Sequence, residues 1–226
     1  MRSVGSLQAV LFDAGNTLVF PNSERILEPL QRRGVVVSDE QLWEVERVAK
    51  LQLDEAILSS GKVDSHFWET YYQRLLAGVG IEDPGLVREL VPQSQRAMNW
   101  DRVLPGTAEV LARLGAKYTL GVISNSDGQI SQLLESVGLA RYFRTIVDST
   151  RVGHEKPDGR IFAAALADVD TPAERALYVG DVYSIDYLGA RNAGMQSVLM
   201  DVSGTYAARE VNRVESLDQL EQALSA

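Results

Sequence analysis

Four residues have the clearest potential for chemistry, because each stands at the end of a short apolar run: Asp13, Ser124, Asp181 and Asp201. If these runs are parallel strands of an open α/β sheet, their carboxyl ends share one rim, and ligands bind outside that rim. An Asp or Ser after a strand is often only a turn residue or a helix N-cap. The coincidence of several such residues favours a common crevice, so we expect at least three of these polar groups to meet there.

Two acids close together in the sequence suggest a metal site. Asp181 and Asp186, in "VGDVYSID", stand on either side of an expected strand-to-helix turn. Carboxylates at such a turn can share Mg2+, which typically takes one or two protein carboxylates together with substrate phosphate and water. The alternative is that Asp181 is a helix cap and Asp186 a solvated acid in the first turn of that helix.

A lysine precedes another expected helix. Lys156 lies in "GHEKPDGRIF", where Pro157 stiffens the chain and Asp158 is a candidate helix cap. Most lysines are solvated surface charges. However, a chain with 22 basic and 31 acidic residues, and thus a net charge of −9, needs a local cation to bind phosphate. A lysine before a helix that covers the sheet is suitably placed for this.

The elements that must position these residues follow from the apolar pattern. The runs are continuous rather than alternating, which is typical of strands buried on both faces of a parallel sheet. Helical patterns separate them from about residue 100 onward, so we predict βαβ units and a doubly wound parallel α/β sheet. The expected strands are 9–14, 119–126, 176–181 and 197–201, with a weaker one at 145–149, and the expected helices are 107–114, 129–137, 159–167 and 185–193.

The segment 21–98 breaks this alternation, and its pattern predicts several amphipathic helices. Its apolar residues recur at steps of three or four, the period of one helix face. We therefore expect residues 1–20 and 99–226 to form the α/β core domain and residues 21–98 to form an all-helical domain over the first strand's carboxyl end. The repeating residues are Leu42, Val45, Ala49, Leu53 and Ala56, then Phe67, Tyr71 and Leu75.

Composition narrows the class of protein. Apolar residues make up 45% of the 226 residues, enough to fill a real core. The charge of −9 disfavours nonspecific binding to nucleic acid or to an anionic membrane. The chain has no cysteine, which excludes disulfides and thiolate chemistry. With no apolar stretch of about 20 residues and nothing like a signal peptide at the N-terminus, we expect a soluble cytoplasmic protein.

Four motifs, in this order, resemble those of the haloacid dehalogenase (HAD) superfamily of hydrolases: "FDAGNTL", "ISNS", "EKPD" and "GDVYSIDYLGARNAGM". The similarity covers residues 6–20 and about 100–203. The helical segment resembles the C1 cap of this family, which closes over the site and selects the substrate. The resemblance implies a Rossmann-like core and a Mg2+-dependent phosphatase for a small phosphorylated metabolite.

The resemblance also implies roles for individual residues. Asp13 would be the nucleophile and would form an aspartyl-phosphate that water then hydrolyses. Ser124 and Asn125 would bind the phosphoryl group. Lys156 would neutralise charge shared by Asp13 and the phosphate.

The same resemblance implies four metal-binding positions. Asp181 would ligate Mg2+ together with Asp13, and Asp186 would bind it directly or through water. The fourth ligand would be the backbone carbonyl of Gly15, which exists whatever the side chain.

Gly15 is also the departure from the family pattern. Phosphatases of the family usually carry there a second aspartate, the general acid and base, and a glycine where this chain has Asn16. An acid–base group is worth about 10²- to 10⁴-fold in rate. We therefore expect either slow turnover restricted to good leaving groups or an acid supplied by the cap. Possible suppliers are His66 and Glu69, with His154 near Lys156, although each is expected to be an ordinary polar residue.

Other functions remain open at this point. A dehalogenase of the superfamily usually has Tyr at position 15, and a phosphonatase has Ala and a Schiff-base lysine in its cap. The candidates for that lysine, Lys50 and Lys62, lie among polar neighbours and are expected to be surface charges. A noncatalytic binding or regulatory protein is a further alternative, although the full set of candidate residues argues against it. A nucleotide-binding Rossmann module is disfavoured, because no G-x-G-x-x-G follows the first strand.

The helical segment contains a group of aromatic residues. They could line a substrate pocket, but aromatic residues at helical spacing more often form the core of a small bundle, and we expect a core role. The group is Trp43, Trp68, Tyr71 and Tyr72.

Overall fold

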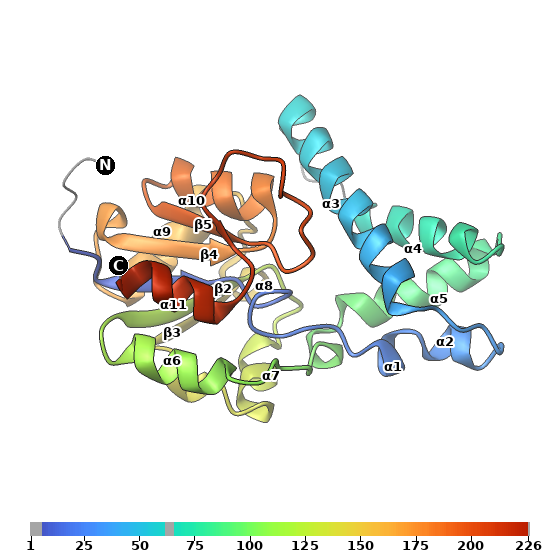
Figure 1. Ribbon diagram of the computed structural model, residues 1–226, viewed down its shortest axis with the longest axis horizontal. Helices are drawn as coiled ribbons and strands as arrows, with labels where there is room; N and C mark the ends of the chain where they lie inside the picture. The colour runs from blue at the N-terminus through green and yellow to red at the C-terminus, as the bar shows by residue number, and fades with distance from the viewer. Residues whose placement is uncertain (1–5, 62–65, 226) are drawn as a thin grey trace.

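The computed structural model describes residues 6–61 and 66–225, and its centre is a sheet of parallel strands (Figure 1). The strand order is β3-β2-β1-β4-β5-β6, and every neighbouring pair is parallel. The predicted doubly wound α/β class is confirmed. The strands are β1 (Ala9–Phe12), β2 (Thr119–Ser124), β3 (Thr145–Asp148), β4 (Ala176–Gly180), β5 (Gln196–Met200) and β6 (Arg213–Val214).

Strand β1 lies in the middle of the sheet and is buried on both faces, as its continuous apolar run predicts. Val10 and Phe12 pack into the core on one face, and Ala9 and Leu11 pack into the core on the other. The first core is covered by α6 (Thr107–Gly115), α7 (Ile130–Ser136) and α11 (Leu217–Ser225). The second is covered by α9 (Gly159–Asp168) and α10 (Leu188–Asn192).

One predicted helix is divided. In place of a helix over 185–193, the chain makes a π-helical turn, η4 (Tyr183–Tyr187), followed by the short helix α10. The N–H groups of Asp186 and Tyr187 both donate to the carbonyl of Val182, at 2.8 and 3.3 Å. This wide turn inserts an extra residue, and such turns are frequent at functional sites. A short helix α8 (Ser149–Val152) follows β3.

Residues 23–99, apart from the undescribed 62–65, form a group of helices beside the sheet that we call the helical lobe (Figure 1). Where the chain leaves and re-enters the core, Phe20 and Arg102 exchange two backbone hydrogen bonds of 2.7 and 3.2 Å. The lobe has its own apolar core. Its helices are α1 (Ser23–Ile26), α2 (Glu28–Gln31), α3 (Asp39–Ser60), α4 (Phe67–Gly78) and α5 (Pro84–Gln95).

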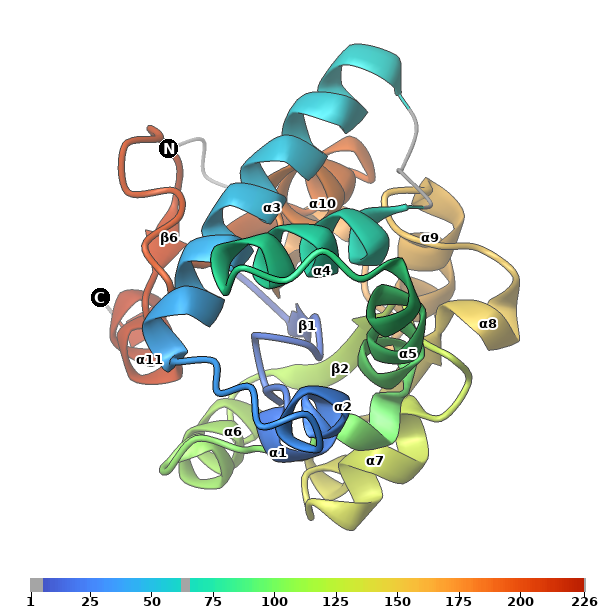
Figure 2. The same ribbon diagram turned by 90° about the vertical axis from the view of Figure 1, so that its right-hand side faces the viewer.

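Helix α3 is the longest element and begins with strong local signals. Ser38 and Gln41 form a reciprocal capping box at its start, and Gly61 ends it in a left-handed conformation with φ of 69°. In the view from the side of the lobe, β1 and β2 are seen between α3 and α4 above and α1 and α2 below (Figure 2). Among the described residues, no helix is both long and apolar enough to cross a membrane.

Candidate active site

Asp13 directly follows β1 at the point where the sheet's chain order reverses. From β1 the chain continues to β2 and β3 on one side, and β4 and β5 lie on the other. This reversal point is where open α/β sheets bind ligands. The N–H of Asp13 donates to the carbonyl of Val179 at 2.7 Å, which fixes Asp13 against the end of β4.

The ammonium group of Lys156 is the centre of the site. Its Nζ donates to Asp13 Oδ1 at 2.5 Å, to Asp186 Oδ1 at 2.8 Å and to the hydroxyl of Tyr178 at 2.9 Å. The three donor positions of an ammonium are therefore all used. Lys156 lies in the loop before α9, as the sequence predicts. Its contact with Asp13 shows that the two predicted residues do come together.

Burial and charge act in opposite directions on these groups. Burial lowers the pKa of Lys156, but the carboxylates of Asp13 and Asp186 outweigh it and raise the pKa above its usual value, so the amine stays charged. Burial raises the pKa of Asp13 to about 7, since loss of hydration and repulsion from Asp186 and Asp181 exceed the lowering effect of Lys156.

Asp186 is held from both sides. Its Oδ1 accepts from Lys156, and its Oδ2 accepts from the N–H of Val182 at 2.9 Å. Gly180, at the end of β4, leaves room for this carboxylate. A Cβ added to Gly180 would stand 2.5 Å from Cγ of Asp186, closer than any real contact. The glycine therefore permits the acid to fold back over the strand end.

Asp13, Asp181 and Asp186 form a buried acidic group. Each offers an oxygen, and these oxygens lie within 4.8 Å of one another. Hard carboxylate oxygens at this spacing suit a divalent cation such as Mg2+. Among the residues of the α/β core alone, three carboxylates and the single ammonium of Lys156 leave an excess of two negative charges, which a divalent cation would balance.

Ser124 and Asn125 lie at the end of β2 and line the same pocket as Asp13. The side chain of Asn125 is engaged with the lysine loop. Its Nδ2 donates to the carbonyl of Lys156 at 3.0 Å, and its Oδ1 accepts from the N–H of Lys156 at 2.8 Å. Asn125 therefore positions the lysine backbone, a role that the sequence does not indicate.

Gly15 lies in the turn after Asp13, beside the ring of Trp100. A Cβ added there would be 3.4 Å from that ring and 4.0 Å from Asp13 Oδ2, and so would face the Asp13 carboxylate. The next residue, Asn16, has φ of 51°, a left-handed conformation that glycine and asparagine adopt most readily. The asparagine is thus a compatible replacement for the usual glycine.

The prediction that Lys50 is a surface charge is wrong. Lys50 lies on the buried face of α3, and its side chain is only 7% exposed. Its Nζ is 2.8 Å from Asp181 Oδ2 and 2.6 Å from Glu46 Oε1. The tertiary contact between α3 and the sheet rim buries this residue, so its polar sequence neighbours are misleading. Lys62 lies outside the described residues.

The same face of α3 touches the core at a second point. Asp54 Oδ1 accepts a hydrogen bond of 2.8 Å from the backbone N–H of Ser184 in η4. Asp54 is 2% exposed. Since Lys50 and Asp54 are four residues apart, both project from one side of the helix. Helix α3 is therefore fixed to the core by polar contacts beside the acidic group.

A pocket of about 750 Å³ joins the rim to the helical lobe. Charged and polar residues of the site line it together with apolar and aromatic residues. The aromatic group of the lobe has a mixed outcome. Tyr72 is buried in the lobe's core, with Trp68 and Tyr71 packed against that core, while all three also face the pocket. Trp43 is 41% exposed, so its predicted core role is wrong.

Several predicted candidates lie away from the pocket. His66, Glu69 and His154 are not among its lining residues; the first two are exposed and His154 is half-buried. Asp201 also stays outside. It accepts from the N–H of Tyr206 at 3.0 Å and pairs with Arg213. Asp201 therefore organises the chain after β5, and three of the four strand-end residues converge.

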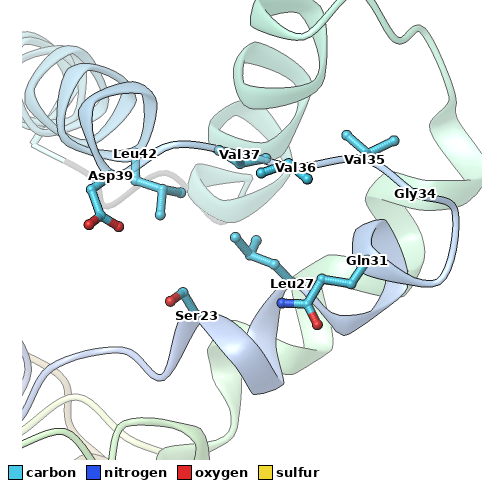
Figure 3. Close-up of a pocket in the computed structure, with 9 residues that line it drawn as sticks. All are labelled: Ser23, Leu27, Gln31, Gly34, Val35, Val36, Val37, Asp39 and Leu42. Atoms are coloured by element: carbon cyan, nitrogen blue, oxygen red, sulfur yellow. The ribbon is translucent and has the colours of Figure 1, made fainter.

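A second pocket, of about 290 Å³, lies in the helical lobe between α1, α2 and the start of α3 (Figure 3). Val35, Val36 and Val37 form one wall. It contains no titratable side chain except Asp39. The chemistry therefore belongs to the first pocket.

Comparison with known proteins gives a matching family and several relatives. A family model described as haloacid dehalogenase-like hydrolase matches residues 44–200. The chain is 31% identical over 209 residues to haloacid dehalogenase-like hydrolase domain-containing protein 3 of Xenopus laevis, which covers 86% of this chain and 84% of the relative. It is 33% identical over 166 residues to the phosphoglycolate phosphatase of Caulobacter vibrioides, covering 71% of this chain and 69% of the relative.

Solved structures share the fold. The HAD-hydrolase YfnB from Bacillus subtilis, bound to magnesium, superposes with a TM-score of 0.71 at 17% identity, covering 98% of this chain and 100% of the other. The 2-haloacid dehalogenase from Pseudomonas syringae pv. Tomato has a TM-score of 0.58 at 25% identity, covering 97% and 98%. Proteins of this fold therefore include both dehalogenases and a magnesium-bound hydrolase.

Proposed function

Because the chain belongs to the haloacid dehalogenase-like hydrolase family, we propose that this hydrolase is a Mg2+-dependent phosphatase acting through Asp13. Its substrate is a small phosphomonoester or acyl phosphate. The observation that carries the proposal is the ammonium of Lys156, which bridges Asp13 and Asp186 beside Asp181 in one buried group.

The reaction has two balanced steps. A carboxylate oxygen of Asp13 bonds to phosphorus while the bond to the leaving oxygen breaks, and that oxygen departs with the electron pair and takes a proton from water. Water then bonds to the phosphorus of the aspartyl-phosphate and gives up a proton. The phosphorus–oxygen bond to Asp13 breaks, which releases inorganic phosphate and restores the carboxylate.

The remaining residues position charge around this centre. Lys156 offsets the negative charge of Asp13 and the incoming phosphate. Ser124 donates its hydroxyl to the phosphoryl group. Asn125 contributes through its backbone, because its side chain holds the loop of Lys156.

The site fits a divalent cation by charge and by donor type, as the excess of negative charge among its core residues and its buried oxygens indicate. Asp13, Asp181 and the carbonyl of Gly15 would hold Mg2+. Asp186 would contribute mainly by fixing Lys156, since both its oxygens already accept hydrogen bonds. When bound, Mg2+ supplies Lewis-acid stabilisation of charge on the phosphoryl oxygens.

The absence of a carboxyl group at Gly15 narrows the range of substrates that react efficiently. Without an acid near the leaving oxygen, substrates whose leaving group departs without protonation react fastest. Acyl and aryl phosphates are of this kind. The aromatic wall of the pocket, which includes Trp68, Tyr71 and Trp100, suits an aryl or other apolar group on the phosphate.

Lys50 raises a second candidate, a phosphonatase-type hydrolase with a Schiff-base lysine. The lysine does lie in the pocket. An imine requires a neutral amine, however. Although burial lowers the pKa of Lys50, the carboxylates of Asp181 and Glu46 raise it above its ordinary value. The amine therefore stays protonated, which favours the phosphatase.

The test is Mg2+-dependent release of phosphate from acetyl phosphate and p-nitrophenyl phosphate by the native protein and by Asp13→Asn. We expect turnover in the native protein, and its loss in Asp13→Asn or in excess chelator. A native protein no faster than Asp13→Asn on both substrates would overturn the phosphatase assignment, and release of halide or of phosphate from a phosphonate would redirect it.

A further inference from the structure

The buried face of α3 brings a second cation to the rim. Lys50 Nζ lies within hydrogen-bond distance of Asp181 and of Glu46, at 2.8 and 2.6 Å. One turn further along α3, Asp54 accepts from the N–H of Ser184. The anchored helix therefore holds the ammonium of Lys50 directly on a carboxylate of the acidic group.

In the proposed function, the carboxylate of Asp181 is also a ligand of the divalent cation. Two positive centres on the same carboxylate repel each other, and the repulsion grows where water is excluded. The side chains of Lys50 and Asp181 are each only 7% exposed. Lys50 on Oδ2 of Asp181 therefore opposes the binding of a divalent cation to the same carboxylate.

We propose that Lys50 is a positioning residue for Asp181. The ammonium of Lys50 holds this carboxylate at the rim and is displaced from it when the divalent cation binds. The proposal rests on the proposed function, because it takes Asp181 to be a metal ligand. It goes further by linking metal affinity to a residue of the helical lobe. Lys50 then acts as an internal counter-ion that the metal displaces.

Glu46 makes this exchange possible at low cost. Glu46 and Lys50 are one helical turn apart on α3, so their ion pair moves as a unit with the helix. After leaving Asp181, the ammonium keeps Glu46 as a partner. A buried ammonium with no second carboxylate would lose its only compensation and would resist displacement.

The charge count gives the direction of the effect. Asp13, Asp181, Asp186 and Glu46 carry four negative charges, and Lys156 and Lys50 carry two positive ones, a sum of −2. Without Lys50 the sum is −3, so the site attracts a divalent cation more strongly. Removal of Lys50 should therefore tighten metal binding.

The experiment measures metal affinity without substrate. Isothermal titration with Mg2+ and with Mn2+ is applied to the native protein, Lys50→Met and the control Lys117→Met, which removes an exposed lysine next to the start of β2. We expect Lys50→Met to bind each cation on the order of tenfold more tightly. Lys117→Met should match the native protein, and metal should raise the melting temperature of Lys50→Met by more.

A double-mutant cycle separates exchange from the general attraction between charges. Glu46→Gln weakens metal binding in either background, since it removes a negative charge. If Glu46 also stabilises the displaced ammonium, the loss is larger when Lys50 is present than in the Lys50→Met background. Equal losses in the two backgrounds would remove Glu46 from the exchange.

The outcomes distinguish this inference from the proposed function. Equal affinities in the native protein and Lys50→Met would overturn the inference and leave the phosphatase intact. Failure of both proteins to bind either cation would overturn both. Lys50→Gln, which keeps a hydrogen-bond donor but no charge, replaces Lys50→Met if the latter is unfolded by circular dichroism, and Lys50→Arg should retain the native affinity.

Discussion

Two buried lysines contact different carboxylates of the same acidic group, and they differ in how they are held. Lys156 belongs to the α/β core and has three partners there, Asp13, Asp186 and Tyr178. Lys50 belongs to the helical lobe and has one partner in the core and one on its own helix. The first lysine is therefore a permanent part of the rim, and the second depends on where α3 lies.

In the proposed reaction, this difference separates two tasks. The fixed cation keeps Asp13 aligned for attack, as preorganised electrostatic stabilisation requires. A cation carried by a helix of the other lobe is held only as firmly as that helix is attached to the core. Variants of the two lysines should therefore differ in what they change, the first in turnover and stability and the second in metal affinity.

The largest expected effect is that of Lys156→Met. Removing one partner of a buried charge cluster leaves uncompensated carboxylates, which costs about 3 to 5 kcal/mol of the free energy of unfolding. Turnover should fall below detection as well, because Asp13 loses its cation. Urea unfolding and phosphate release measure the two effects. A stable and active Lys156→Met protein would remove the distinction between the two lysines.

Gly15→Asp should produce the next largest change, a gain. The added Cβ finds room at 3.4 Å from the ring of Trp100 and faces Asp13. A general acid there should raise kcat for alkyl phosphates by about tenfold to a hundredfold and change aryl phosphates less. Gly15→Ala, which fills the same space without a carboxyl group, is the control. A similar gain in the alanine variant would show that packing, not proton transfer, limits the rate.

The part of the site that lies in the α/β core, the core half, could be predicted from the sequence, because the place of each residue follows from the apolar run beside it. Asp13, Ser124 and Asp181 each follow a continuous apolar run, and parallel strands necessarily bring such residues to one edge. Lys156 was a candidate from its place before a helix and from the need for a local cation, but its pairing with Asp13 was implied only by the family resemblance. The two-residue strand β6 was missed, because it exists only through pairing with β5.

The part of the site that comes from the helical lobe, the lobe half with Lys50 and Asp54 of α3, could not be predicted in the same way. Whether Lys50 faces water or the rim depends on how α3 docks on the core, which no local pattern encodes. One indication was present: Glu46, Lys50 and Asp54 recur at steps of four, beside the apolar stripe that includes Ala49 and Leu53. Charged residues at the edge of a buried helix face are a reason to expect polar contacts across a domain boundary.

Gly180→Ala should have a smaller effect. It tests how closely the residues of the core half pack against one another. The new methyl group would overlap Cγ of Asp186, displace it from Lys156 and destabilise the protein by about 1 to 3 kcal/mol. Gly159→Ala is the control, because a Cβ added there meets nothing within 4 Å. Urea denaturation of both variants measures the difference. Equal stabilities would show that Asp186 can relax, and so that the rim is less rigid than its contacts indicate.

The smallest effect is expected from Asp54→Ala, which tests the attachment of the lobe half. The variant leaves the N–H of Ser184 without its acceptor, at a cost of about 1 kcal/mol after the gain in helix propensity. Glu55→Ala, at the exposed neighbouring position, should cost little. Metal titration gives the sharper result: with α3 less firmly attached, Lys50 competes less well, and Mg2+ should bind Asp54→Ala more tightly than Glu55→Ala. Weaker binding by Asp54→Ala would mean that the docking of α3 supports the metal ligands directly, so that the helical lobe belongs to the fixed part of the site.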